Sequence, residues 1–281
     1  MIKINGELVN IEKFPDGTPR INIDMEKLNN TLPTHLGHQP ILIEWFYENN
    51  DELFYLILVK RHLETHFINV NFYLHLPYIP NARMDRVKSN DEVFTLKYFC
   101  EIINLLKFDS VYVLDAHSDV STALLNNCVN NSPKKFIEEV IKELPDDIVL
   151  YFPDAGAAKR YSGLFPEIMY CYGEKQRDWK TGKILGLDVI ANEQIYKLKN
   201  KPILMIDDII SYGGSLFYSA KALKDLGVGT IYAYVTHTEN SILDKEKGTF
   251  IKSLEDNTVE RLFTTNSLFT GNHNKITTME V

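Results

Sequence analysis

The sequence predicts an α/β protein built from parallel sheets flanked by helices, arranged in two tandem halves. Short apolar runs rich in β-branched residues recur between turn signals, as strands do. Several runs are apolar almost throughout, which is typical of strands buried on both faces of a sheet. Amphipathic helical patterns separate the runs, and alternation of strand and helix favours parallel sheets.

The predicted strands are, in chain order, 53–59, 68–76, 110–115, 147–152, 202–207 and 230–236. Helices are expected over 94–108 and 215–226, where apolar residues recur on one face and Gly227 follows as a C-cap. The alternation occurs on either side of a polar and then helical segment that breaks at Pro145. The sequence therefore predicts two domains, 1–140 and 141–281.

Composition excludes several classes of protein. The chain of 281 residues carries 30 Lys and Arg against 38 Asp and Glu, a formal charge of −8, which argues against a nucleic-acid-binding protein. Cys100, Cys128 and Cys171 are widely spaced and form neither a disulfide framework nor a zinc pattern. No run approaches the roughly 18 apolar residues of a membrane span. We therefore expect a cytoplasmic protein with no membrane or nucleic-acid partner.

The most informative segment runs from Pro202 to Thr238. An apolar strand ends in Asp207 and Asp208, and a glycine loop then opens an amphipathic helix; the loop comprises Ser211, Tyr212, Gly213, Gly214 and Ser215. Backbone N–H groups in such a loop converge on a phosphate, and the helix N-terminus adds its positive end. Two adjacent carboxylates at the strand tip suit the two hydroxyls of a ribose, or a metal ion.

This segment resembles the phosphoribosyl diphosphate (PRPP) motif that type I phosphoribosyltransferases share with ribose-phosphate diphosphokinases, the PRPP synthetases. The resemblance implies two tandem type I phosphoribosyltransferase-like domains, with Asp207, Asp208 and the loop 211–215 binding ribose phosphate. Because both groups of enzymes carry the motif, the rest of the chain has to separate them.

A second segment, LDAHSDV, follows the predicted strand 110–115. Alternate spacing in an extended chain would put Asp115, His117 and Asp119 on one side, where they suit a hard cation and proton transfer. The segment is similar to the divalent-cation signature of PRPP synthetases. That resemblance implies that Asp115 and His117 bind metal near ATP, and that His117 also contacts the nucleotide.

Two further segments are similar to the nucleotide-binding elements of the same family. YIPNARMDRV (78–87) resembles its Y-x-x-x-A-R-Q-D stretch, which implies that Arg83 and Asp85 bind ATP. KFPDG (13–17) resembles its F-x-D-G-E element through Phe14 and Asp16, although P-D-G is also a common turn signal. In that family the element reaches the adenine of a neighbouring subunit, so the resemblance implies a homo-oligomer, a dimer or a hexamer.

The predicted second domain carries two more matching segments. YFPDAGAAKRY (151–161) resembles the family's P-D-x-G-x-x-x-R run. The resemblance implies that Asp154 is a second carboxylate that binds metal and lies on the ribose side of the site. GEKQRDWKTGKI (173–184) resembles a mobile K-x-R loop that closes on the ATP phosphates, so Lys175 and Arg177 are expected to be catalytic together with His117.

The sequence as a whole therefore favours a Mg²⁺-dependent diphosphotransferase that uses ATP as co-substrate. The acceptor is either ribose 5-phosphate, which feeds nucleotide biosynthesis, or ADP-ribose, which would feed NAD salvage. Tyr212 motivates the second acceptor, because it stands where the family has a small hydroxyl residue. A phosphoribosyltransferase that consumes PRPP and a non-catalytic regulatory homologue remain as alternatives.

Overall fold

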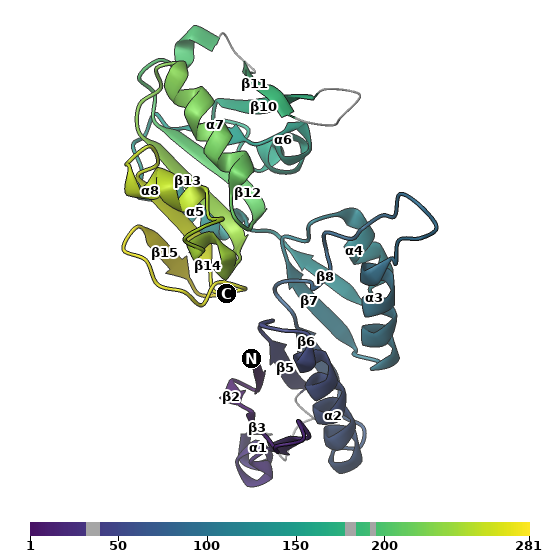
Figure 1. The fold of residues 1–281 in the computed structure, drawn as a ribbon. Coiled ribbons are helices and arrows are strands. Elements are labelled where there is room, and N and C mark those ends of the chain that lie inside the picture. The colour runs from purple at the N-terminus through teal and green to yellow at the C-terminus, as the bar shows by residue number, and fades with distance from the viewer. Residues whose placement is uncertain (32–39, 178–183, 192–194) are drawn as a thin grey trace. The chain divides into compact units, whose positions relative to one another are not determined.

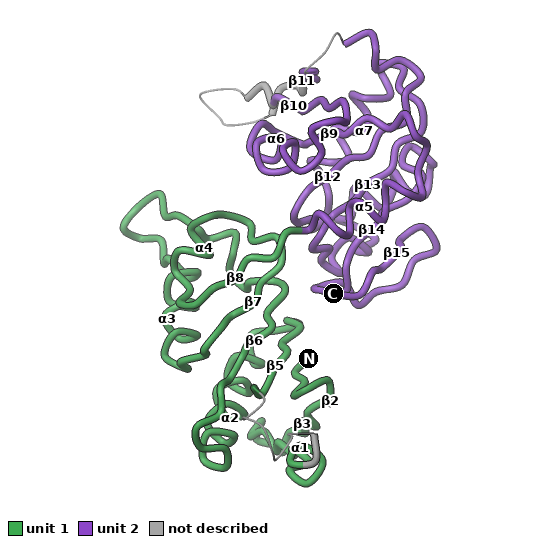
Figure 2. Tube along the Cα trace, turned by 180° about the vertical axis from the view of Figure 1, so that it is seen from behind, with its two compact units in different colours: residues 1–132 green, residues 133–281 purple. Residues whose placement is uncertain are grey.

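The computed structural model describes residues 1–31, 40–177, 184–191 and 195–281. They form two compact units, Met1–Ser132 and Pro133–Val281, which Figure 2 distinguishes by colour. The division precedes helix α5 (Lys134–Lys142), whereas the sequence analysis places it near residue 140, inside that helix.

The first unit contains a six-stranded sheet in the order β2-β1-β5-β6-β7-β8 (Figure 1). Its parallel strands are β5 (Ile41–Trp45), β6 (Phe72–His75), β7 (Ser110–Leu114) and β8 (Cys128–Asn131). At the β5 edge the antiparallel strands β1 (Ile2–Ile4) and β2 (Glu7–Leu8) are added. A separate hairpin of β3 (Asn10–Lys13) and β4 (Pro19–Asn22) leads into α1 (Met25–Thr31).

Helices α2 (Asp51–His66), α3 (Thr95–Leu105) and α4 (Asp119–Leu124) connect the parallel strands of this unit. Side chains alternate along each strand, so Ile41, Ile43 and Trp45 point into the core while their neighbours remain partly accessible. The inward set packs against apolar residues of α2 and α3 in one cluster. The sheet is thus held by burial of one face against its crossover helices.

One predicted strand is wrong. Residues 53–59 lie inside the 16-residue helix α2, and the buried positions of this helix include Tyr55, Leu56, Val59 and Leu63. These recur at intervals of three and four, which is the period of a helix that buries one side. Phe54 and Leu58 lie on the exposed side of the helix and are also apolar, so the run is apolar on both sides. The helical period was therefore not visible in the sequence, and the run resembled a continuous buried strand.

The second unit contains a seven-stranded sheet in the order β11-β10-β9-β12-β13-β14-β15. Its strands are β9 (Val149–Phe152), β10 (Tyr170–Arg177), β11 (Ile184–Ala191), β12 (Ile203–Ile210), β13 (Ile231–Thr238), β14 (Arg261–Thr265) and β15 (Ile276–Met279). Only the β10–β11 pair in this sheet is antiparallel among the described strands. The chain moves from β9 outward to β10 and later returns to place β12 on the other side of β9. The strand order therefore reverses between β9 and β12, and ligands of open α/β sheets bind at such a point.

The helices of the second unit, besides α5, are α6 (Ala155–Tyr161), α7 (Gly214–Asp225) and α8 (Phe250–Glu255). Single turns of 3₁₀ helix lie at Ser162–Leu164, Ile195–Leu198 and Asn240–Leu243. The helices predicted over 94–108 and 215–226 are α3 and α7, and Gly227 after α7 has the left-handed φ of 74° expected of a C-cap. Both sheets are mainly parallel, which confirms the predicted α/β class.

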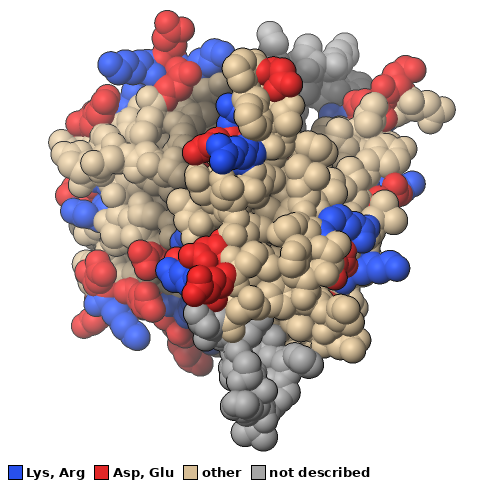
Figure 3. All heavy atoms as spheres, turned by 90° about the horizontal axis from the view of Figure 1, so that it is seen from below, with Lys and Arg blue, Asp and Glu red and all other residues tan. Residues whose placement is uncertain are grey.

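Acidic and basic side chains are interspersed on the surface that Figure 3 presents. The mixture of both signs agrees with a modest acidic excess. Within the described residues, every helix is too short or too polar to cross a lipid bilayer.

Candidate active site

The acidic pair of the second unit lies toward the carboxyl end of β12, two residues before the strand ends at Ile210, and beside the point where the strand order reverses. Asp207 and Asp208 are consecutive on the strand, and the Asp208 backbone N–H donates to Asp207 Oδ1 at 3.0 Å. Burial raises the pKa of Asp207 well above its usual value, and the neighbouring charge of Asp208 adds to this effect. Asp154 raises the same pKa further, so its carboxylate lies near the pair. The strand tip therefore gathers negative charge that a bound cation would relieve.

Arg160 provides a counter-charge that the sequence analysis did not single out. Its Nη1 lies 3.4 Å from Oδ2 of Asp208, which is 5% exposed. Arg160 is the last residue of the P-D-x-G-x-x-x-R run that begins at Pro153, so this motif already indicated Arg160 as a candidate site residue. Asp154, at the start of that run, caps α6 by accepting the N–H of Ala157 at Oδ1 over 3.0 Å.

The loop after β12 depends on one glycine in particular. Gly213 has φ of 81°, and a Cβ built there would collide with the Cβ of Phe250 and lie 2.9 Å from Ile210 Cδ1. Gly214, the first residue of α7, differs, since its nearest neighbour would be Thr249 Oγ1 at 3.8 Å. Gly213 thus fixes the turn that brings the N-terminus of α7 to the strand tip.

Two residues of this loop are held by the segment that follows β13. The Ser211 hydroxyl lies 3.0 Å from the Ser241 hydroxyl, which in turn donates to Glu239 Oε2 at 3.0 Å. The Tyr212 carbonyl accepts from the backbone N–H groups of Thr249 and Phe250 at 2.9 and 3.1 Å. Its ring is 39% exposed, and Lys247 Nζ lies 5.9 Å from the ring centroid. The phenol therefore borders the loop on its solvent side next to a cation.

Asp115 and His117 occupy the corresponding strand end of the first unit, after β7. Asp115 is 3% exposed and has a left-handed φ of 45°, while its N–H donates to the carbonyl of Asn131 at 2.9 Å. The extended chain expected through Asp119 is wrong, because β7 ends at Leu114 and Asp119 begins α4. Asp115 and His117 therefore lie in the turn between strand and helix, and His117 is half-buried there.

The other predicted nucleotide-binding residues of the first unit lie on loops. Arg83 is exposed and Asp85 half-buried in the loop after β6, where Arg86 Nε approaches Asp85 Oδ1 at 3.7 Å. Phe14 and Asp16 lie at the tip of the β3–β4 hairpin, and the Phe14 ring is 52% exposed. Asp16 Oδ1 accepts the N–H of Thr18 at 3.0 Å, and this bond lowers the pKa of Asp16. The P-D-G segment thus forms a turn that presents an aromatic ring to solvent.

Lys175 and Arg177 lie on β10, paired with Leu187 and Ile184 of β11. A bulge between Gln176 and Arg177 shifts the register at the end of this ribbon. Their side chains, and residues 178–183 beyond them, lie outside the described part of the structure.

The predicted metal ligands fall in different units, since Asp115 and His117 belong to the first and Asp154 to the second. Within the described ranges, no three Asp, Glu, His or Cys side chains gather as a ready metal cage. The donors present are nevertheless hard carboxylate oxygens and one imidazole, which fit a cation such as Mg²⁺ that keeps several waters. The raised pKa of Asp207 is an independent sign that positive charge would stabilise the strand tip of the second unit.

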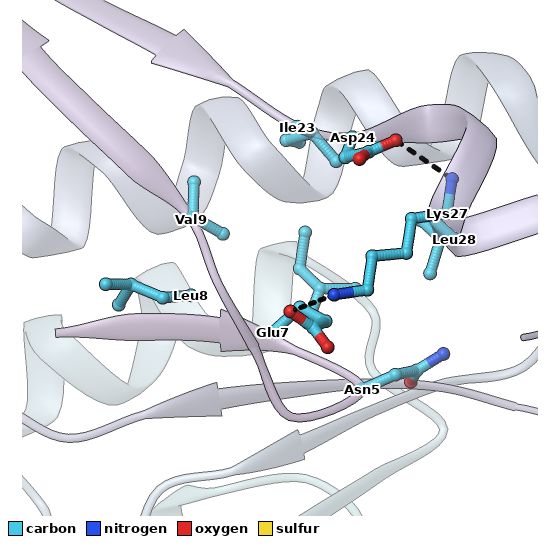
Figure 4. Close-up of a pocket in the computed structure, with 9 residues that line it drawn as sticks. Asn5, Glu7, Leu8, Val9, Ile23, Asp24, Lys27 and Leu28 are labelled. Carbon is cyan, nitrogen blue, oxygen red and sulfur yellow. Dashed lines mark hydrogen bonds and ion pairs between the residues drawn. The ribbon is translucent and has the colours of Figure 1, made fainter.

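A pocket elsewhere in the first unit contains none of the predicted site residues. It has a volume of about 140 Å³ and lies between the β1–β2 hairpin and α1 (Figure 4). Glu7 and Lys27 form an ion pair of 2.7 Å across it, and the Lys27 N–H donates to Asp24 Oδ1 at 2.9 Å. Its polar groups already satisfy one another, which favours a structural role.

No protein-family model matches the sequence. The chain is 28% identical over 237 residues to the ribose-phosphate pyrophosphokinase of Pyrococcus furiosus, a match that covers 82% of this chain and 77% of that protein. The protein of the same name from Sulfurisphaera tokodaii is 26% identical over 273 residues, which cover 95% of this chain and 87% of that one. The crystal structure of phosphoribosylpyrophosphate synthetase from Mycobacterium smegmatis matches with a TM-score of 0.73 at 17% identity, over 97% of this chain and 86% of the other.

The chain is a divergent homologue of the ribose-phosphate pyrophosphokinases. A match that covers 95% of the chain necessarily includes both units, so the homology extends beyond the glycine loop of the second unit. The fold shared with the PRPP synthetase confirms the predicted architecture over nearly the whole chain.

Proposed function

We propose that this chain is a ribose-phosphate pyrophosphokinase-type enzyme that transfers the β,γ-diphosphate of ATP to the anomeric hydroxyl of a 5-phosphorylated ribose and releases AMP. The observation that carries the proposal is the strand tip at Asp207 and Asp208, followed by the Gly213 turn into α7 at the reversal of strand order. Homology to pyrophosphokinases across both units supports the ATP-dependent reaction over that of a simple transferase.

Each group of residues has a distinct task in this reaction. Asp207 and Asp208 would hold the ribose hydroxyls, with Arg160 orienting Asp208 through their ion pair. The backbone N–H groups of loop 211–215 would bind the 5-phosphate at the N-terminus of α7. Catalysis would come mainly from positioning and from charge neutralisation, because phosphoryl transfer needs little covalent chemistry from the protein.

The residues expected on the ATP side complete this arrangement. Arg83, Lys175 and Arg177 would neutralise charge on the transferring phosphates, and His117 would contact the nucleotide. A bound Mg²⁺ would polarise the phosphoryl oxygens and offset the developing charge. Asp115, His117 and Asp154 are the side chains that would hold it.

The exposed tip of the β3–β4 hairpin supports assembly into a homo-oligomer. Phe14 lies at the turn of this hairpin and is 52% exposed, so its aromatic ring is accessible to a partner. Such a ring suits stacking on the adenine of a neighbouring subunit, as the sequence resemblance implies.

Tyr212 and Lys247 support an acceptor that carries a further group on its 5-phosphate, as ADP-ribose does. The exposed phenol face offers a stacking surface beside the phosphate loop, and Lys247 adds a cation there. Ribose 5-phosphate has no aromatic group that would stack on Tyr212. The product from ADP-ribose would be ADP-ribose 1-diphosphate, a substrate for a salvage transferase.

The reaction is tested by incubating the purified full-length chain with ATP, Mg²⁺ and either acceptor, and measuring AMP release. We expect AMP with at least one acceptor and none after EDTA treatment, with recovery when excess Mg²⁺ is added. Equal or faster turnover of ribose 5-phosphate would exclude the preference for ADP-ribose. Diphosphate release from PRPP and a base without ATP would instead identify a phosphoribosyltransferase.

A further inference from the structure

The last turn of α2 carries two histidines on its exposed side. His62 and His66 are four residues apart, and their ring centroids lie 4.4 Å from each other with the planes inclined by 48°. Side chains at this spacing are neighbours on a helix surface. Two imidazoles four residues apart on one helix are a recurring arrangement for binding a single metal ion.

Hydrogen bonding fixes the tautomer of one ring. His66 Nδ1 lies 2.9 Å from the carbonyl oxygen of His62 and 3.0 Å from Thr65 Oγ1. The Thr65 hydroxyl donates to the same carbonyl at 2.7 Å. A carbonyl only accepts, so in the neutral ring the proton is on Nδ1 and the lone pair on Nε2. Metal-binding histidines are oriented by such a bond from their other nitrogen.

The charged groups around the pair leave the two rings available. Glu64 accepts from Lys60 Nζ at 2.6 Å and from Arg61 Nη1 at 3.0 Å, so this carboxylate is engaged with other partners. The rings also lie at the C-terminal end of a 16-residue helix. The helix dipole is negative at this end and favours a cation.

An apolar hollow of about 200 Å³ borders one of the rings. It is lined by His62 together with Pro19, Ile21, Ile23, Leu58 and Val59. An apolar wall limits the orientations of the imidazole and so lowers the entropy lost when it binds a metal.

We propose that His62 and His66 form a two-histidine chelate for a transition metal ion of the Cu²⁺, Ni²⁺ or Zn²⁺ class, with water in the remaining positions. A site whose two protein ligands are both imidazoles favours these ions, whereas Mg²⁺ prefers a site dominated by carboxylate and water oxygens. The site is therefore separate from the cation of the proposed reaction, and it stands whether or not that reaction occurs.

The test titrates Ni²⁺ into metal-free, full-length protein by calorimetry, with Mg²⁺ as the negative ion. Replacing either histidine, as His62→Asn or His66→Asn, should weaken binding by roughly tenfold to hundredfold, because the second ligand binds intramolecularly. His273→Asn is the matched control, since His273 lies outside α2, on the second unit, with its Nδ1 accepting the Lys275 N–H at 3.2 Å. Unchanged affinity in both α2 variants, or no binding by the parent chain, overturns the proposal.

Two further measurements locate the ion without relying on a substitution. The paramagnetic Ni²⁺ ion should broaden the imidazole NMR signals of His62 and His66 before those of the other histidines. Affinity should also fall steeply from pH 7.5 to pH 5, since protonated imidazoles do not ligate. Selective broadening of other histidines would place the site elsewhere and contradict the inference.

Discussion

In the proposed ribose site, the ionised form of Asp207 is strongly disfavoured by its surroundings. Its carboxyl lies beside Asp208 and near Asp154, and burial is the largest cause of its raised pKa. Arg160 contacts Asp208 and so offsets only part of this charge. A residue whose ionised form is disfavoured in the folded protein is typical of a ligand-binding site, where substrate or metal completes the environment.

The raised pKa of Asp207 predicts how stability depends on pH. Folding favours the protonated acid, so its contribution is fully present below the unfolded pKa near 3.8 and is lost as pH rises through the folded value. Asp207→Asn should therefore stabilise the metal-free protein at pH 8, with a smaller effect at pH 4.5. Urea unfolding at both pH values measures this.

The same Asp207→Asn variant should lose activity by at least roughly 100-fold, since it removes charge from the proposed site. Asp146→Asn is the control, because Asp146 is exposed at the surface of the second unit. If Asp207→Asn instead lowered the free energy of unfolding by the same amount at both pH values, ionisation of the Asp207 carboxyl would not be what destabilises the folded protein.

The two glycines of the loop should respond differently to the same substitution. Gly213→Ala combines a left-handed φ with a collision against Phe250, so it should cost about 2–4 kcal/mol. Gly214→Ala meets only an ordinary contact with Thr249 at 3.8 Å and should change stability by less than about 0.5 kcal/mol. Thermal unfolding compares the pair, and equal losses would mean that packing of the loop on α8 is unimportant.

Among the elements, α2 shows how tertiary packing decides an ambiguous sequence. Phe54, Leu56 and Leu58 would all share one face of a strand. In the helix, Leu56 is fully buried whereas Phe54 and Leu58 are 53% and 36% exposed. The helix also carries the histidine pair to its C-terminal end, so the same element serves both the core and a surface site.

This assignment predicts a sharp contrast between neighbouring substitutions. Leu56→Ala should cost about 2–4 kcal/mol, since it leaves a cavity in the core of the first unit. Phe54→Ala and Leu58→Ala should each cost less than about 1 kcal/mol, because water already reaches both side chains. Three similar losses in chemical denaturation would favour a strand instead.

At the scale of the whole molecule, each unit contains its own hydrophobic core. One cluster draws on residues between Ile2 and Cys128, and the other on residues between Val149 and Ile276. The proposed tasks are divided accordingly, with Asp115, His117 and Arg83 in the first unit and the ribose-phosphate loop in the second. A reaction between two substrates is a physical reason to retain both units.

Separate cores predict that the units fold separately. Fragments 1–132 and 133–281 should each give a cooperative thermal transition by circular dichroism. Neither fragment alone should release AMP from ATP, because each lacks half of the proposed residues. A fragment that is unfolded, or one that is active by itself, would contradict this division.

The sequence by itself determined the α/β class, the strands that carry Asp207 and lead into Asp115, and the helix that begins at the glycine loop. It ended the first of these strands at Asp207, whereas β12 continues to Ile210. These features are local, since they depend on apolar runs, turn residues and strand–helix alternation within short windows. Neither the helical nature of 53–59 nor the ion pair of Arg160 with Asp208 was found this way. The turn at Asp115 was also missed, because its conformation depends on a hydrogen bond to Asn131, on the neighbouring strand.

Only the tertiary structure decided which of these residues meet. Gly213 is required because Phe250, far along the chain, packs against it, and the pKa of Asp207 is raised because folding buries it beside two other carboxylates. Contacts between residues distant in sequence arise from packing of whole elements, and no local pattern encodes them. The sequence therefore indicated which chemical groups are present, while packing set the charge, exposure and partners of each.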